Sequence, residues 1–163
     1  MSSERPTETS STSGYRTLGI VAAAHSVTHM QAALMPLLYP LIMSQFGLTY
    51  GDIGLMTGVS RAVGNVAQGA HGFTVRRFFR RTLLGAGNLL LGVAILMMAL
   101  AGSFPLFFAF SVLAQLAKSP QHPIGTSLVA DVFGRRLRGS ALAVDFAGGN
   151  LGWSSCPSQG WPS

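Results

Sequence analysis

The stretch TLLGAGNLLLGVAILMMALAGSFPLFFAFSVLAQLA, residues 82–117, contains no Asp, Glu, Lys or Arg. As a single helix its 36 residues would extend about 54 Å. One crossing of a bilayer core of about 30 Å needs only about 20 apolar residues. The sequence GSFP at residues 102–105 combines glycine and proline and is the natural place for a break. The stretch therefore predicts two successive membrane-spanning helices, at residues 82–101 and 105–130.

The composition of the whole 163-residue chain also indicates a membrane protein. Charged residues make up 10% of the chain, compared with about 25% in ordinary soluble proteins. A second uncharged run covers residues 17–51, and both runs lack the regular polar stripe of a soluble amphipathic helix. We therefore expect an all-α integral membrane protein with four transmembrane helices and an incomplete fifth. The expected spans are residues 17–46, with Pro36 and Pro40 as sites of kinking, 53–75, 82–101, 105–130 and 140–152.

The basic residues of the expected loops lie on one side of the membrane. Arginines occur in a Ser/Thr-rich tail at residues 1–16, which we expect to be disordered, and in the loops at 76–81 and 135–138. The other two loops contain no Lys or Arg, which predicts a cytoplasmic N-terminus and a multi-pass protein of the inner (cytoplasmic) membrane. The sequence RRFFRR at residues 76–81 could also bind nucleic acid through its arginines and aromatic rings. Its place between two hydrophobic spans favours a membrane-protein loop, so we expect no nucleic-acid partner.

Polar and ionisable residues occur inside the expected spans, where such groups are costly and usually functional. Within the first, second and fourth spans they recur at helical spacing and so share a face. Counted from the nearest loops, His29, Arg61 and Lys118 all lie near the middle of the membrane. The third span offers only Asn88 and is expected to face lipid. We predict a central aqueous cavity for protons and substrate, formed by His25, His29, Arg61, Asn65, Gln68, Gln115, Lys118, His122 and Asp145.

Other interpretations of these residues also follow from the sequence. His25 and His29 could simply hydrogen-bond within a helix interface, and two histidines without a third ligand are a weak metal signature, so we expect no metal and no cofactor. Pro120 and Pro123 interrupt the fourth span beside its charged residues, a pattern typical of substrate sites. The single cysteine, Cys156, excludes an intrachain disulfide. Enzyme chemistry has no support, since neither a nucleophile–base arrangement nor a phosphate-binding loop occurs.

Three sequence motifs resemble those of a known family. They are AHSVTHMQAALMPLLYPLIMSQFGLTYGDIGLMTG at residues 24–58, HP at 122–123 and GGNLG at 148–152. Over residues 18–152 the chain resembles the N-terminal half of a major facilitator superfamily transporter, and most closely a drug exporter of the fosmidomycin-resistance type. The resemblance implies twelve spans in two halves, with export of small drugs or metabolites in exchange for protons. The partners it implies are the lipid bilayer, a small-molecule substrate and protons.

The resemblance also assigns roles to particular residues. The sequence GFTVRRFFRR at residues 72–81 occupies the place of the superfamily motif Gly-x-x-x-Asp-Arg-x-Gly-Arg-Arg, a cytoplasmic gating loop. Gly72, Arg77, Arg80 and Arg81 fit this motif, whereas Arg76 stands at its acidic position. His25 matches a histidine of the family, and His29 replaces the Asp usual in the exporter subfamily. Under this transporter hypothesis, the matched depth of the polar groups leads us to expect proton handling by His25 and His29, substrate or gating contacts by Arg61, Lys118 and His122, and an ion pair between one of those cations and Asp145.

The last residues, WSSCPSQGWPS at 153–163, contain no aliphatic side chain. They stand where the family's fifth helix would continue, and residues 140–152 alone are too short to cross a bilayer. We therefore expect residues 153–163 to be a polar tail foreign to the family, produced by a frameshift or premature stop, on a truncated transporter that is inactive alone. Two alternatives are a small four-span membrane protein that oligomerises and a membrane adaptor that does not transport.

Overall fold

The computed structural model describes residues 12–74, 79–134 and 136–154, and these residues form helices joined by short loops. No strand occurs in this described part of the chain, in agreement with the all-α prediction. The helices are α1 (Thr12–Phe46), α2 (Tyr50–Thr74), α3 (Arg80–Ala99), α4 (Phe104–Lys118), α5 (Gln121–Val132) and α6 (Arg138–Ser154).

Helix α1 begins earlier than the sequence predicted. It starts at Thr12, inside the tail expected to be disordered at residues 1–16, of which residues 1–11 lie outside the described ranges. The Tyr15 ring packs edge-on against Phe133 with centroids 5.6 Å apart. These tertiary contacts stabilise a first turn whose Ser- and Thr-rich sequence favours disorder by itself. Near the other end of the chain, residues 153 and 154 belong to α6, and the rest of the expected polar tail lies outside the described residues.

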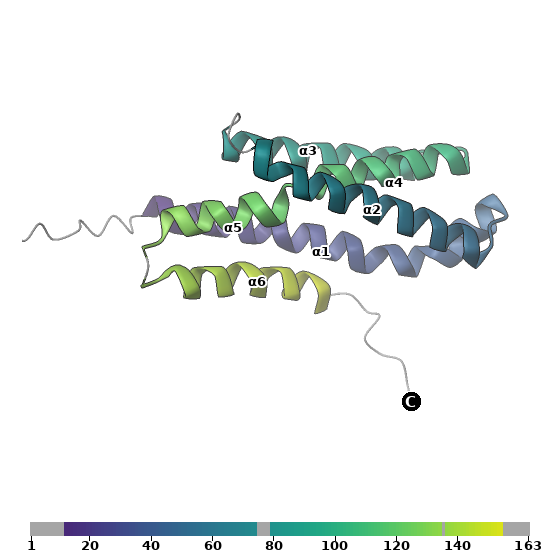
Figure 1. Cartoon of the computed structure of the whole chain (residues 1–163). Coiled ribbons are helices and arrows are strands. Elements are labelled where there is room, and N and C mark those ends of the chain that lie inside the picture. The colour runs from purple at the N-terminus through teal and green to yellow at the C-terminus, as the bar shows by residue number, and fades with distance from the viewer. Residues whose placement is uncertain (1–11, 75–78, 135, 155–163) are drawn as a thin grey trace, which may run out of the picture.

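The helices are arranged around the long helix α1 (Figure 1). Helix α6 packs along one side of α1 and makes its most extensive contact with it. Helices α2, α3 and α4 group together on the other side, with α4 in contact with both α2 and α3. Helix α5 contacts α1, α6 and α3, so it links the two groups. Despite Pro36 and Pro40, α1 is one continuous helix over 35 residues.

The turn between α1 and α2 is built from local signals. Gly47 follows the last residue of α1 with φ 65°, the left-handed conformation that glycine adopts without strain. The Leu48 N–H then donates to the Met43 carbonyl over 3.0 Å, which satisfies an unpaired carbonyl at the helix end. At the start of α2, the Asp52 N–H donates to the Thr49 hydroxyl oxygen, and the Thr49 N–H donates back to the Asp52 carboxylate over 2.8 Å. This reciprocal arrangement is a capping box.

The Asp52 cap should make stability depend on pH in the acid range. Hydrogen bonds from the Thr49 hydroxyl and from its N–H lower the pKa of Asp52 below its usual value. A carboxylate with a lowered pKa stabilises the fold above its unfolded pKa of about 4, and this contribution is lost as the pH falls through the folded value. The difference in melting temperature between wild type and Asp52→Asn should therefore shrink between about pH 5 and pH 2. A difference that stays constant over this range would contradict the cap.

The predicted fourth span, residues 105–130, is two helices. Pro120 lacks an N–H, and the chain turns at residues 119–120 between α4 and α5, where the prolines predicted an interruption. The break leaves α4 with 15 residues and α5 with 12. Within the described ranges, α3 is the one helix whose own length and apolarity suit a membrane crossing, with a mean hydropathy of 2.0 over its best window. The expectation of four complete transmembrane helices therefore stays a prediction.

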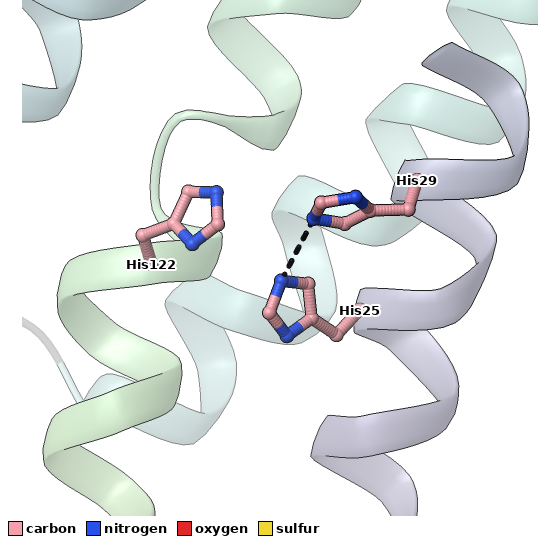
Figure 2. A group of neighbouring side chains, drawn as sticks. All are labelled: His25, His29 and His122. Carbon is pink, nitrogen blue, oxygen red and sulfur yellow. Dashed lines mark hydrogen bonds between the residues drawn. The ribbon is translucent and has the colours of Figure 1, made fainter. Parts of the chain in front are cut away.

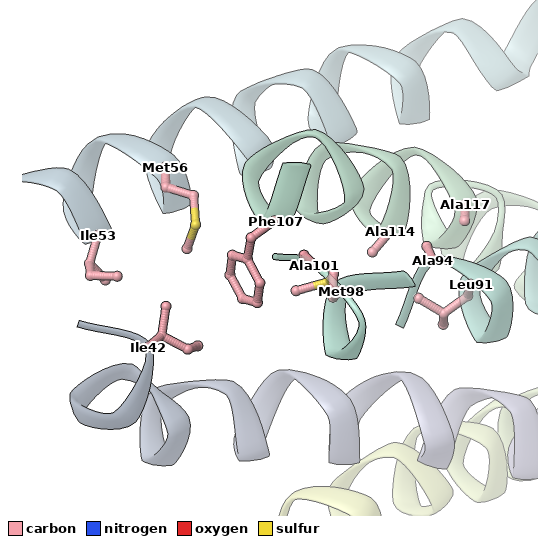
Figure 3. Packing of buried hydrophobic residues seen from close by; sticks show 10 residues of the cluster. All are labelled: Ile42, Ile53, Met56, Leu91, Ala94, Met98, Ala101, Phe107, Ala114 and Ala117. Atoms are coloured by element: carbon pink, nitrogen blue, oxygen red, sulfur yellow. The ribbon is translucent and has the colours of Figure 1, made fainter. Parts of the chain in front are cut away.

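Two hydrophobic clusters lie on either side of this break. The first joins the C-terminal half of α1 to α2, α3 and α4 (Figure 3), and consists of Ile42, Ile53, Met56, Leu91, Ala94, Met98, Ala101, Phe107, Ala114 and Ala117. The second joins the N-terminal half of α1 to α3, α5 and α6, and consists of Leu18, Val21, Leu84, Ile124, Leu128, Val129, Phe133 and Ala141. Between them, α1 carries His25 and His29, and the α4–α5 junction carries Lys118 and His122. The fold therefore places a polar layer between two apolar cores.

Gly87 should be intolerant of a side chain, because α3 passes very close to α4 there. A Cβ at Gly87 would lie 2.7 Å from the Ala117 carbonyl oxygen, so Gly87→Ala should lower the free energy of unfolding by about 1–3 kcal/mol. Gly85 is the matched control, since it is exposed and a Cβ there meets nothing within 4 Å. Gly85→Ala should be neutral or stabilising by up to about 1 kcal/mol. Unfolding in rising concentrations of sodium dodecyl sulfate, followed by circular dichroism, measures both variants, and equal effects would contradict this close approach.

Candidate functional site

The polar layer contains two neighbouring cavities. We call the first the polar cavity; it measures about 200 Å³ and is lined by α1, α2, α4, the α4–α5 turn and α5. The second measures about 270 Å³ and lies toward the first hydrophobic cluster. Arg61, Asn65, Gln115 and Lys118 line both cavities. The polar cavity is also lined by Thr28, His29, Ala32, Gly64, Gln68, Ser119 and His122.

Seven of the nine residues predicted to form a central cavity therefore share one site. They come from α1, α2, α4 and α5. They meet because these helices pack side by side, with the residues that the sequence predicted to lie in the middle of each span at the same level. Helix α2 presents Arg61 and Asn65, both of which are exposed, so the cavity is open on that side. Gly64 allows the close approach, since a Cβ there would lie 3.1 Å from the Gln115 Cβ. The other two predicted residues, His25 and Asp145, do not line the polar cavity. His25 lies one turn from His29 on α1, beside Asp145 of α6.

Lys118 has a partner that the sequence analysis did not single out. Its ammonium group donates a hydrogen bond to the Gln31 side-chain oxygen in α1 over 3.2 Å. Gln31 lines the second cavity together with Arg61 and Lys118. Gln31 could have been found from the sequence, because it is an amide inside an otherwise apolar span. The same criterion had selected Asn65 and Gln68. The pair fixes the position of Lys118 at the end of α4.

Three histidines meet at the side of the polar cavity (Figure 2). His25 and His29 lie one turn apart on α1, and their Nε2 atoms are 3.1 Å apart in hydrogen-bonding contact. His122 projects from the first turn of α5 toward them, with its ring centroid 5.1 Å from that of His25 and 6.2 Å from that of His29. The i, i+4 spacing predicted the first contact, whereas the approach of His122 depends on how α5 packs against α1.

Asp145 pairs with His25, and this corrects the expectation that it would pair with Arg61, Lys118 or His122. The Asp145 Oδ1 lies 3.4 Å from the His25 Nδ1, and both residues are 2% exposed. Neither of these two atoms makes a hydrogen bond within the described part of the chain. The reason for the difference is the position of α6, which makes its most extensive contact with α1, the helix of His25, and a smaller one with α5, the helix of His122, so that Asp145 lies beside His25.

Two glycines bring α6 this close to α1. A Cβ at Gly148 would lie 3.1 Å from the Ala22 carbonyl oxygen, and one at Gly149 would lie 3.1 Å from the His25 ring. The Ser26 hydroxyl donates to the Gly148 carbonyl over 2.5 Å and ties the two helices together. The GGNLG motif noted in the sequence therefore has a packing role, because only small residues leave room for the histidine pair.

The predicted gating loop is described only in part. Gly72 lies in the last turn of α2, and Arg76 and Arg77 lie outside the described residues. Arg80, at the start of α3, forms an ion pair with Asp131 near the end of α5. Arg81 is exposed on the same turn of α3. An ion pair between these helix ends was not expected, since Asp131 had no assigned role.

Helix α3 buries Leu84, Leu91, Ala94 and Met98 in the two hydrophobic clusters, and the expectation that this span faces lipid stays a prediction. It provides no lining residue of the polar cavity, and Leu89 and Leu96 are exposed on it. A third cavity of about 430 Å³ lies between α1, α3 and the start of α4 and is lined almost wholly by apolar side chains. It holds none of the predicted site residues. We therefore place the candidate functional site at the polar cavity.

Comparison with known proteins identifies the class of protein to which this fold and site belong. Residues 21–160 match the sequence model of the Major Facilitator Superfamily, and the chain therefore belongs to that family. The members of this family are transporters that cross the membrane several times, so the chain is a membrane protein and the resemblance in its sequence is confirmed. The family is generally non-enzymatic, in keeping with the lack of a catalytic motif.

Two relatives of known sequence are similar to the chain. It is 28% identical over 140 residues to the fosmidomycin resistance protein of Escherichia coli (strain K12), a match that covers 86% of this chain and 34% of the relative. It is 26% identical over 154 residues to the uncharacterized MFS-type transporter YfnC of Bacillus subtilis (strain 168), covering 94% of this chain and 37% of the relative. The chain thus spans about a third of the length of these relatives.

Proposed function

We propose that this chain supplies the substrate-binding layer of a secondary transporter that exports a small anionic solute in exchange for protons. The observation that carries the proposal is the convergence of Arg61 and Lys118 on neighbouring cavities in the polar layer. Cations inside a membrane protein that face a cavity mark a substrate or ion pathway. Two of them favour an anionic group, with Asn65, Gln68 and Gln115 available as uncharged hydrogen-bonding partners.

Protons are assigned to the histidines in this proposal. His29 lines the polar cavity, and His25 lies behind it between His29 and the buried Asp145. Histidine exchanges protons near neutral pH, so this row of three groups offers a route by which a proton leaves or enters the cavity. The proposed orientation has the N-terminus and the loop at 76–81 in the cytoplasm, with the polar layer near the middle of the membrane.

The activity belongs to a complete transporter, because the chain spans about a third of the length of its relatives. The test is therefore a fusion of residues 1–152 to the part of the E. coli fosmidomycin resistance protein that follows its matched segment. Fosmidomycin, the compound in the name of that relative, is the first substrate to measure. Cells expressing the fusion should export it faster than cells expressing an unrelated membrane protein, and a protonophore should abolish the difference.

A fusion that reaches the membrane but exports no faster than the control would contradict the proposal for this substrate. Binding of fosmidomycin to the 163-residue chain in detergent is the second measurement. It covers the case in which the fusion does not reach the membrane, and absence of binding would then count against the proposal.

A further inference from the structure

The three histidines beside the polar cavity have the geometry of a metal site. The ligand nitrogens of His25, His29 and His122 all lie within 4.8 Å of one another. Zinc binds imidazole nitrogens at about 2.0–2.1 Å in a tetrahedral arrangement, which places neighbouring ligand atoms about 3.3 Å apart. The Nε2 atoms of His25 and His29 are 3.1 Å apart, close to that spacing. His122 is exposed at the start of α5, so its side chain has room to close the remaining distance.

Asp145 gives the cluster a second feature of metal sites. Histidine ligands usually offer one ring nitrogen to the metal and donate the other ring N–H to a carboxylate. The His25 Nδ1 faces the Asp145 carboxylate at 3.4 Å, and its Nε2 faces His29. A proton held on Nδ1 by Asp145 leaves the lone pair of Nε2 directed into the cluster. Of the three buried side-chain atoms without hydrogen bonds in the described part of the chain, His25 Nδ1 and Asp145 Oδ1 are then explained as an orienting pair, and the third is the His71 Nδ1.

The surroundings indicate what else an ion there would bind. His29 and His122 line the polar cavity, so the fourth ligand would come from that side. Arg61 and Lys118 line the same cavity and oppose a bare divalent cation. The Asp145 carboxylate offsets part of that charge, and an anionic fourth ligand taken from the cavity offsets more. Three imidazoles with one exchangeable position form a zinc-type site, and imidazole also suits copper, nickel and cobalt.

We propose that His25, His29 and His122 bind one divalent transition-metal ion of the zinc type, with Asp145 as the positioning residue behind His25 and the fourth position open to the polar cavity. The sequence alone offered only His25 and His29 at helical spacing, and α5 supplies the third ligand. This inference does not depend on transport, because it concerns binding by the chain itself.

The test is titration of the metal-free 163-residue chain with Co²⁺, using protein purified in detergent through a tag without histidine. Tetrahedral Co²⁺ gives strong visible absorption, and Zn²⁺ should displace it. Wild type should bind about one Co²⁺ per chain, as three ligands around one open position imply. His29→Gln and His122→Gln should abolish the absorption band. Asp145→Asn should weaken the affinity about 10- to 100-fold while keeping the band.

His71→Gln is the matched control, since His71 lies on α2, contacts the Ser119 hydroxyl at 2.8 Å and is not one of the three clustered histidines. It should bind Co²⁺ like wild type. His29 and His122 are less buried than His25, so their variants carry the test, and circular dichroism confirms that helix content is kept. The proposal is overturned if wild type shows no tetrahedral band, if His122→Gln binds normally, or if His71→Gln loses binding equally.

Discussion

Transport by the complete fusion should fall about 10- to 100-fold when either Arg61 or Lys118 loses its charge. A hydrogen bond to a charged group contributes about 1.5–3 kcal/mol, and each 1.4 kcal/mol corresponds to about a tenfold change. Arg61→Gln and Lys118→Met keep much of the side-chain length and remove the charge. The substrate concentration for half-maximal export should rise, because the proposed role is to bind the anion. Initial export rates over a range of substrate concentrations measure this effect.

Arg138→Gln is the control for this prediction. Arg138 is exposed at the start of α6 and lines none of the described cavities. Its replacement should leave export unchanged once the amount of protein in the membrane is equalised. Gln31→Ala should have a smaller effect than Lys118→Met, because Gln31 orients the ammonium group through one hydrogen bond and carries no charge. Equal export by wild type, Arg61→Gln and Lys118→Met would contradict the proposal that Arg61 and Lys118 bind the substrate.

Replacing His25 with leucine should lower the free energy of unfolding by about 3–5 kcal/mol, the usual cost of leaving a buried ion-pair partner alone. The Asp145 side chain is 3% exposed, and the His25 Nδ1, 3.4 Å from its carboxylate, is its polar partner in the described chain. The double variant His25→Leu/Asp145→Val should recover most of this loss, because no buried charge is left without a partner. Detergent unfolding in the presence of a metal chelator measures the four members of this cycle without a contribution from bound metal.

The exposed ion pair between Arg80 and Asp131 provides the comparison. Its side chains are 38% and 63% exposed, so solvent and salt screen it strongly. Arg80→Leu should therefore change the free energy of unfolding by less than about 1 kcal/mol. If His25→Leu cost no more than Arg80→Leu, the pairing of His25 with Asp145 would contribute nothing to stability.

Much of this molecule follows from local sequence. The uncharged run at residues 82–117 predicted α3 and α4 with a break between them, and Pro120 predicted the interruption between α4 and α5. Helical spacing and counting from the loops placed His29, Arg61 and Lys118 at one level, and all three line the polar cavity. Local sequence can predict such features because hydrophobic length, proline and the rise of a helix act within a single segment. The membrane spans themselves and the roles of these residues in transport stay predictions.

The predictions that failed concern contacts between segments. Asp145 was expected to pair with a different cation, because its partner depends on the side of α1 against which α6 packs. Helix α1 begins before residue 17, because the Tyr15 ring packs on Phe133, more than a hundred residues away. Neither contact has a signal in the local pattern.

The amino-acid sequence by itself determined that this protein is helical, that it belongs in a membrane, and that several of its helices carry polar groups on one face. These properties depend on the length, charge and periodicity of single segments. Only the tertiary structure decided which polar groups meet: Lys118 with Gln31, His25 with Asp145, and His122 with the two histidines of α1. The physical reason is that a helix period fixes the face on which a side chain lies, whereas packing at Gly148 and Gly149 determines which helix that face meets.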